Sequence, residues 1–183
     1  MSEFTEGELL VALRQRHTYS GNGGSGRWAF LTHVRTGAAW DQQEMDALAI
    51  DLWPSGRHDL HAFEVKCSRS DWLREIRPDT SKSDAARAIC DTFTIVALSG
   101  LVRTGELPVG WGLIEATRTD AGIPLRRVVK PARLQPLSRP HERTISRGFL
   151  AAILRAAGVV PGMTTGLKRR SPRAVAVDPG EGM

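Results

Sequence analysis

Alternating apolar and polar positions in the first half of the chain predict a β-hairpin. Residues 45–52 and 60–67 each have the pattern of a strand, and a Pro-Ser-Gly turn separates them. Successive side chains of a strand point to opposite faces of a sheet, so Glu64 and Lys66 share one face of the second strand. Their apolar neighbours share the other face, which predicts that this strand packs against a core.

The remaining apolar patterns indicate an α/β fold. Helical spacing predicts helices over residues 5–16, 70–76 (with Ser70 or Asp71 as N-cap), 83–90 and 143–157. Short apolar runs predict further strands over residues 28–34, 92–98, 109–116 and 125–130. A helix between two strands is typical of a crossover that joins parallel strands. We therefore expect a mixed sheet of four or five strands flanked by helices.

Length and composition are those of one folded domain with a tail. The chain has 183 residues, of which 41% are hydrophobic and 25% charged. We expect a domain over residues 1–158 and a basic, Pro- and Gly-containing, disordered tail over residues 159–183. No apolar run approaches the roughly 20 residues of a membrane span, and no secretory leader is evident, so a cytoplasmic protein without membrane association is expected. Two cysteines without CxxC spacing give no sign of a zinc ribbon or iron–sulfur site.

Charge is distributed unevenly along the chain. Residues 1–117 carry 12 Lys and Arg against 16 Asp and Glu, a net charge of −4. Residues 118–183 carry 13 Lys and Arg against 4 Asp and Glu, a net charge of +9. The first part can hold a cation while the second attracts a polyanion, although a solvated basic face explains the second part equally well.

The predicted hairpin contains candidate residues for metal-dependent chemistry. Asp46 lies within an apolar strand, where a carboxylate is unfavourable unless it is paired or binds a metal ion. Glu64 and Lys66 follow on the neighbouring strand, two positions apart. Two carboxylates and an ammonium group are what hydrolysis of a phosphodiester by a divalent cation requires. An exposed ion pair across two strands is the simpler explanation of Glu-x-Lys alone.

The segment Phe63-Glu64-Val65-Lys66, with Asp46 before it, resembles the active-site hairpin of the PD-(D/E)xK nuclease superfamily. The predicted order of helix, strand, hairpin, helix and strand matches as well. Residues 64–73 and 107–113 resemble small phage and bacterial proteins of this superfamily, and the resemblance covers residues 5–116. One departure is Met45, which occupies the position before the aspartate where the superfamily often has proline. The resemblance implies a restriction-endonuclease-like core.

The resemblance also implies roles for individual residues. Asp46 and Glu64 would bind Mg²⁺ or Mn²⁺ through their carboxylates, and the backbone carbonyl of Val65 would complete the site. Lys66 would orient the attacking water or stabilise charge on the phosphate. Glu8 corresponds to an acid that some members add to the metal site from their first helix. A capping box formed with Thr5 explains Glu8 equally well.

Several basic residues are candidates for contacts with nucleic acid. Arg69, Lys82, Arg143 and Arg147 could bind phosphate groups, and each has solvated surface as the simpler explanation. His58 and His61 form an HxxH pair without a third ligand, which favours two exposed turn histidines over zinc. The sequence does not decide between a monomer and a homodimer.

Three functions are compatible with these patterns. The first is a metal-dependent DNA nuclease in DNA repair, recombination or phage DNA processing, with RNA left open as a substrate. The second is a catalytically inactive nucleic-acid-binding module with a nuclease-like fold. The third, and weakest, is an interaction protein whose basic tail docks on an acidic partner.

Overall fold

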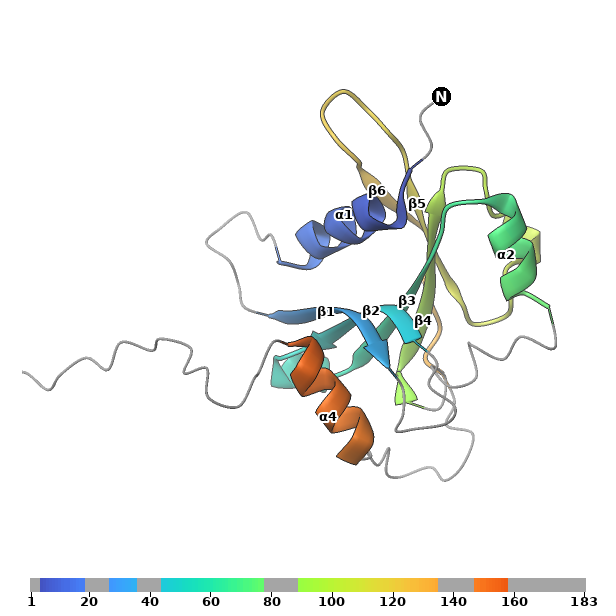
Figure 1. Ribbon diagram of the computed structural model, residues 1–183. Coiled ribbons are helices and arrows are strands. Elements are labelled where there is room, and N and C mark those ends of the chain that lie inside the picture. The colour runs from blue at the N-terminus through green and yellow to red at the C-terminus, as the bar shows by residue number, and fades with distance from the viewer. Residues whose placement is uncertain (1–3, 19–26, 36–43, 78–88, 135–146, 158–183) are drawn as a thin grey trace, which may run out of the picture.

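A computed structural model describes residues 4–18, 27–35, 44–77, 89–134 and 147–157, which form a mixed β-sheet with helices on both sides (Figure 1). The elements of the described residues are α1 (Glu6–Thr18), β1 (Trp28–Arg35), β2 (Glu44–Asp51), the 3-10 turn η1 (Pro54–Gly56), β3 (Leu60–Lys66), α2 (Arg69–Glu75), β4 (Thr92–Leu98), the 3-10 turn η2 (Thr104–Glu106), β5 (Gly112–Ala116), β6 (Leu125–Val129) and α4 (Arg147–Ala156).

The six strands of the described residues lie in the sheet in the order in which they occur along the chain. β1–β2, β2–β3 and β5–β6 are antiparallel pairs, whereas β3–β4 and β4–β5 are parallel. The predicted hairpin and the mixed sheet are therefore confirmed. The expected count of four or five strands is wrong, because β1 and β6 both join the sheet as its edges. Arg126 and Arg127 are exposed on β6, and such charges protect an edge strand from further pairing.

The sheet separates two hydrophobic cores. One core holds Phe63 and Val65 of β3 together with the leucines of α1. The other holds Ala62 of β3 together with Trp72 of α2 and Phe149 of α4. The predicted alternation along β3 is therefore confirmed, and it assigns Glu64 and Lys66 to the face of Ala62.

Helix α1 begins with the predicted capping box. The backbone N–H of Thr5 donates to Glu8 Oε2 at 2.9 Å, and the backbone N–H of Glu8 donates to Thr5 Oγ1 at 3.3 Å. Leu9, Leu10 and Leu13 are buried against the sheet. The helix continues to Thr18, two residues beyond the prediction.

Helix α2 begins earlier than predicted. Its N-cap is Ser68 rather than Ser70 or Asp71, because the Ser68 hydroxyl accepts the backbone N–H of Asp71 at 3.2 Å. Trp72 is fully buried and fixes this short helix against the core.

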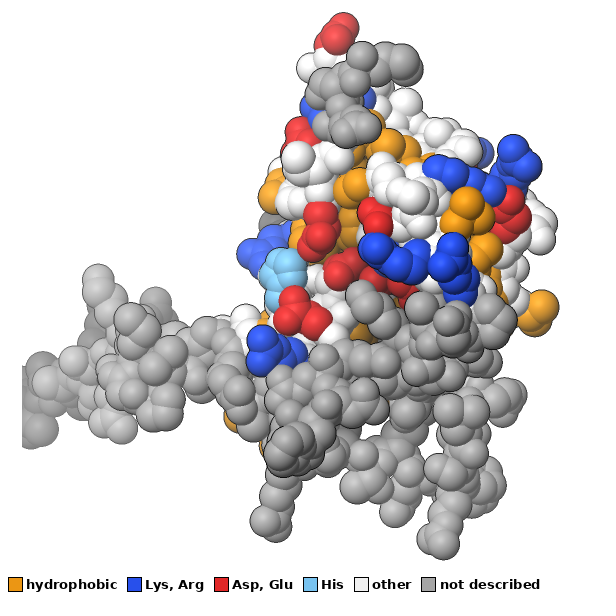
Figure 2. Space-filling model, turned by 45° about the vertical axis from the view of Figure 1, so that its right-hand side comes forward, with side chains coloured by type: hydrophobic (Ala, Val, Ile, Leu, Met, Phe, Trp, Pro, Cys, Tyr) orange, Lys and Arg blue, Asp and Glu red, His pale blue; other side chains and the backbone are white. Residues whose placement is uncertain are grey.

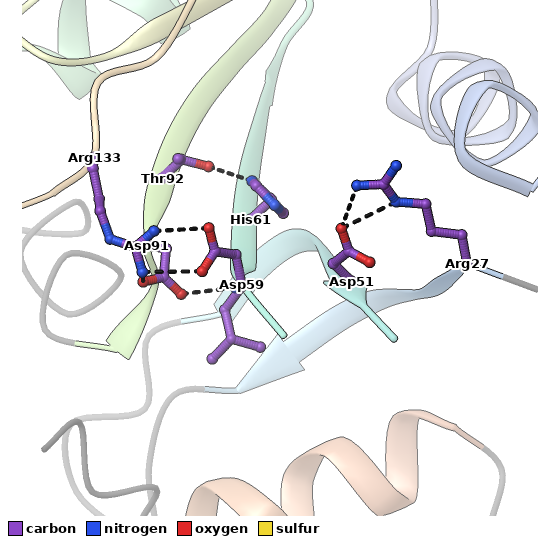
Figure 3. Close-up of polar contacts among 8 residues, drawn as sticks. Arg27, Asp51, Asp59, His61, Asp91, Thr92 and Arg133 are labelled. Atoms are coloured by element: carbon purple, nitrogen blue, oxygen red, sulfur yellow. Dashed lines mark hydrogen bonds and ion pairs between the residues drawn. The ribbon is translucent and has the colours of Figure 1, made fainter. Parts of the chain in front are cut away.

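Ion pairs hold the turn end of the β2–β3 hairpin (Figure 3). Arg27 donates to Asp51 with Nη2 at 2.6 Å, and Arg133 donates to both Asp59 and Asp91. These contacts join the hairpin to the residue before β1, to the residue before β4 and to the segment after β6. They fix one end of β2 and β3, so the register at the other end is determined.

The histidines of this hairpin differ from the prediction of two exposed turn residues. His58 is exposed, as expected. His61 is half-buried within β3, where its Nδ1 lies 2.7 Å from the hydroxyl of Thr92 and its ring meets Trp28 edge-on. Burial lowers the pKa of His61.

Several predicted segments lie outside the described residues. These are most of the helix predicted over 83–90, the start of the helix predicted over 143–157, and the tail 159–183. Of the helices that the structure describes, none combines the length and the apolar character needed to span a membrane.

Candidate functional site

The hairpin places Asp46 beside the strand that carries Glu64. At this end of the hairpin, the last residue pair between β2 and β3 is Ala47 with Phe63. The next residue, Asp46, contacts β3 through its side chain instead of its backbone. Its Oδ2 accepts the backbone N–H of Val65 at 2.7 Å. A carboxylate therefore bonds a backbone donor of the neighbouring strand, which fixes it at the point where the two strands diverge.

Lys66 lies against Glu64 in a buried position. Its Nζ is 2.7 Å from Glu64 Oε1, and the side chains are only 9% and 5% exposed. Burial alone would lower the pKa of Lys66, but the charges and hydrogen bonds of Glu64 and Glu75 together outweigh burial, so the pKa is raised. Lys66 therefore carries its positive charge in this site at neutral pH.

Glu75 is a member of this group that the sequence analysis did not identify. Its Oε2 lies 2.9 Å from Lys66 Nζ, and its side chain is 4% exposed. It occupies the last residue of α2, one helical turn after the fully buried Trp72. An acid at a core-facing position of the helix after Glu-x-Lys is the sequence signal that points to it.

The environment of Glu64 raises its pKa to about 7. Burial is the largest cause, and the negative charge of Asp46 is the second. Lys66 opposes both effects through its charge and hydrogen bond. Glu64 and Asp46 therefore repel each other within a site that solvent does not screen fully.

This repulsion decides whether a divalent cation fits. Carboxylate oxygens are the ligands that Mg²⁺ and Mn²⁺ prefer, and a cation between Asp46 and Glu64 would remove the unfavourable interaction. Among the residues that the structure describes, no three His, Cys, Asp or Glu side chains already form a metal-binding group. The donor set fits a site with two carboxylates, in which backbone and water oxygens supply the other ligands.

Further acids surround the open side of the hairpin. Burial raises the pKa of the Cys67 thiol, and nearby carboxylate charges raise it further; they belong to Glu6, Asp71, Asp46 and Glu8. Figure 2 brings the α2 side of the molecule forward and shows acidic side chains gathered on this face, with lysine and arginine side chains beside them. The face combines acids that attract a cation with basic groups that attract an anion.

Glu8 belongs to the edge of this acidic region. Besides Thr5, its carboxylate bonds Arg118, whose Nη2 lies 2.9 Å from Oε1. The hydrogen bond from the backbone N–H of Thr5, and then the one from the Arg118 side chain, lower the pKa of Glu8. Both oxygens of Glu8 thus have partners, which supports the helix-cap interpretation of this residue.

The predicted phosphate contacts have different outcomes. Arg69 forms a bidentate ion pair with Glu106 and also donates to the carbonyl of Leu101 at 3.0 Å. Its guanidinium therefore joins α2 to η2, although the Arg69 side chain remains 38% exposed. These ion-pair contacts are an alternative to the predicted phosphate contact. Arg147 is the first residue of α4. Lys82 and Arg143 lie outside the described residues.

Comparison with known proteins shows a shared fold. No protein-family model and no curated protein matches the chain. A solved structure of a protein of unknown function from Silicibacter pomeroyi matches it with a TM-score of 0.53 and 18% sequence identity, over 86% of this chain and 88% of that chain. At this identity the likeness concerns the fold alone. Most of this α/β chain therefore has the same overall arrangement as that bacterial protein.

Proposed function

We propose that the chain is an Mg²⁺- or Mn²⁺-dependent nuclease with a PD-(D/E)xK-type site and a restriction-endonuclease-like core, acting on DNA in repair, recombination or phage DNA processing. The observation that carries the proposal is the convergence of Asp46, Glu64 and Lys66 at the open end of one hairpin. The Asp46 carboxylate bonds the strand of the other two, and Lys66 contacts Glu64 directly.

Each of these residues has a task in phosphodiester hydrolysis. Asp46 and Glu64 would hold the cation, with the carbonyl of Val65 as a further ligand. The bound cation would polarise the phosphate and lower the pKa of a water molecule. Lys66 would supply a fixed positive charge for the attacking water or the phosphate oxygens, in a site where burial strengthens electrostatic interactions.

The acidic pair also explains why a cation is needed. A phosphodiester is an anion, and a site with two or three carboxylates repels it. Partial protonation of Glu64, whose pKa is raised to about 7, reduces this repulsion only in part. Asp46 and Glu64 would hold a divalent cation whose charge would offset theirs, so that the phosphate could approach.

Cleavage of DNA by the purified chain tests the proposal. Linear and circular DNA are incubated with Mn²⁺, with Mg²⁺ and with EDTA. We expect metal-dependent cutting that falls at least about a hundredfold in Asp46→Ala, Glu64→Gln and Lys66→Met. Asp120→Ala is the matched control, because Asp120 is exposed in the β5–β6 connection. Metal-dependent cutting that survives in all three site variants contradicts the proposal.

The alternative function is a nucleic-acid-binding module that retains the nuclease fold without catalysis. One observation favours it: the ammonium of Lys66 already lies between the carboxylates of Glu64 and Glu75. Such a module binds DNA in a salt-dependent manner that Asp46→Ala does not affect. Calorimetric titration with Mn²⁺ separates the two functions, since the nuclease requires a metal site that depends on Asp46 and Glu64.

A further inference from the structure

Lys66 is held from two sides, by its own strand and by helix α2. Its Nζ lies 2.7 Å from Glu64 Oε1 and 2.9 Å from Glu75 Oε2. We infer that Glu75 is a positioning residue for the proposed hydrolysis, which keeps the Lys66 ammonium in place when Glu64 engages a cation. This inference rests on the proposed function.

The demand for a second carboxylate follows from the double role of Glu64. A carboxylate that binds a divalent cation donates electron density to the metal, so its hydrogen bond with a lysine weakens. Lysine has a flexible four-carbon stem and a single point charge, and it needs a fixed partner to keep one orientation. Glu75 supplies this partner without belonging to the predicted metal ligands.

Burial makes the contact between Glu75 and Lys66 specific. The side chains are 4% and 9% exposed, so water competes little for either charge. A buried carboxylate is unfavourable without a cationic or hydrogen-bonding partner. Lys66, the lysine of the Glu-x-Lys pattern, supplies such a cationic partner.

The contacts of α2 with neighbouring segments fix the position of Glu75 relative to Lys66. Ser68 caps the N-terminus of the helix, and Arg69 pairs with Glu106. The indole N–H of Trp72 donates to the same Glu106 carboxylate at 3.3 Å. Three contacts therefore fix a helix of seven residues, and Glu75 at its end takes a defined position relative to β3.

A double-mutant cycle on DNA cleavage tests the inference. We expect Glu75→Gln to lower kcat at least about tenfold and to leave the KM for DNA within about twofold. Glu75→Asp, which keeps the charge, should recover part of kcat. In a Lys66→Met background, Glu75→Gln should cause no further loss, because Glu75 acts through Lys66.

The control is Glu115→Gln, which removes another buried carboxylate, two strands across the sheet from Lys66. Glu115 lies on β5 and bonds Arg126. It should leave kcat unchanged even where it lowers the melting temperature. Circular dichroism confirms that each variant is folded. If folded Glu75→Gln retains the kcat of the wild type, or if its loss adds fully to that of Lys66→Met, the inference is overturned.

A measurement without catalysis separates this inference from the proposed function. Acetic anhydride labels accessible amines, and mass spectrometry compares Lys66 with the exposed Lys130. We expect weak labelling of Lys66 in the wild type. The labelling should increase severalfold in Glu75→Gln and should not increase in Glu115→Gln. If the wild type does not cleave DNA, the proposed function is refuted. If the labelling of Lys66 is unchanged in Glu75→Gln, the inference that Glu75 positions Lys66 is refuted.

Discussion

The Oδ2 atom of Asp46 accepts the backbone N–H of Val65 at 2.7 Å, where strands β2 and β3 diverge. A side chain thus continues the bonding of the ladder for one more residue. The consequence is that a carboxylate lies beside Glu64 in a largely buried site, and its charge contributes to the raised pKa of Glu64.

Removing this charge changes the protonation of Glu64. Asp46→Asn keeps an oxygen acceptor for the N–H of Val65 but abolishes the repulsion between the carboxylates. We expect the pKa of Glu64 to fall below its value of about 7 in the wild type, while burial keeps it above the ordinary 4.5. Carbon-detected NMR titration of the glutamate carboxyl groups in the metal-free protein measures the change. An unchanged or higher pKa would show that the two carboxylates do not interact.

The raised pKa of Glu64 also gives the metal-free protein a pH-dependent stability. The folded state binds the Glu64 proton more tightly than the unfolded state, whose carboxyl has the ordinary pKa of 4.5. The contribution of Glu64 is therefore most favourable below pH 4.5 and is lost as the pH rises to about 7. Each tenfold difference in proton affinity between the folded and unfolded states corresponds to about 1.4 kcal/mol in the free energy of unfolding.

Comparison with Glu64→Gln isolates this effect, because other carboxyl groups act in the opposite direction. Glu106, for example, has its pKa lowered to about 2 by the hydrogen bond from Arg69, and its contribution is lost as the pH falls. We expect the stability of the wild type relative to Glu64→Gln to decrease between pH 4.5 and 7 in urea unfolding experiments. A relative stability that increases over this interval would contradict the assignment.

The two interpretations of Glu8 predict different results for one substitution. Glu8→Gln weakens the capping box and removes the ion pair with Arg118, so we expect a small decrease in the free energy of unfolding. Calorimetry should give an unchanged affinity for Mn²⁺, because both oxygens of Glu8 have other partners. A drop in affinity of about tenfold or more would make Glu8 a metal ligand. Thr5→Ala, which affects the cap alone, is the matched control.

Arg69 should contribute to stability rather than to DNA affinity. Arg69→Ala removes the bidentate contact with Glu106 and frees the start of α2, so its melting temperature should fall. Arg69→Lys should not restore it, because an ammonium cannot form the same paired contact. Arg127→Ala, at an exposed position of β6, serves as the control. If Arg69→Ala melts like the wild type and loses DNA affinity, Arg69 acts on phosphate after all.

The sequence predicted the hairpin because a local rule governs it. Alternation along residues 60–67 assigned Phe63 and Val65 to a core, and the structure confirms that they pack under α1. The same rule placed Glu64 and Lys66 together on the opposite face, where their side chains form an ion pair. Period-two alternation depends on the backbone alone, so one sequence is sufficient.

Contacts between distant segments could not be derived in this way. Glu75 reaches Lys66 only because α2 folds back over β3, and Arg69 meets Glu106 across 37 residues. Helical spacing from Trp72 marks Glu75 as core-facing, but it does not show which residue Glu75 contacts, since the docking of Trp72 determines where the helix lies. The predicted N-cap of α2 was wrong for a related reason, because Ser68, Ser70 and Asp71 lie within four residues and all are of types that cap helices.

Anomalous diffraction from a crystal soaked in Mn²⁺ tests the metal site most directly. We predict a manganese peak in contact with the carboxylates of Asp46 and Glu64, and its loss in crystals of Glu64→Gln. The crystals are soaked at the Mn²⁺ concentration used in the DNA cleavage assay. The account would be contradicted if no manganese bound beside Asp46 and Lys66 remained between Glu64 and Glu75.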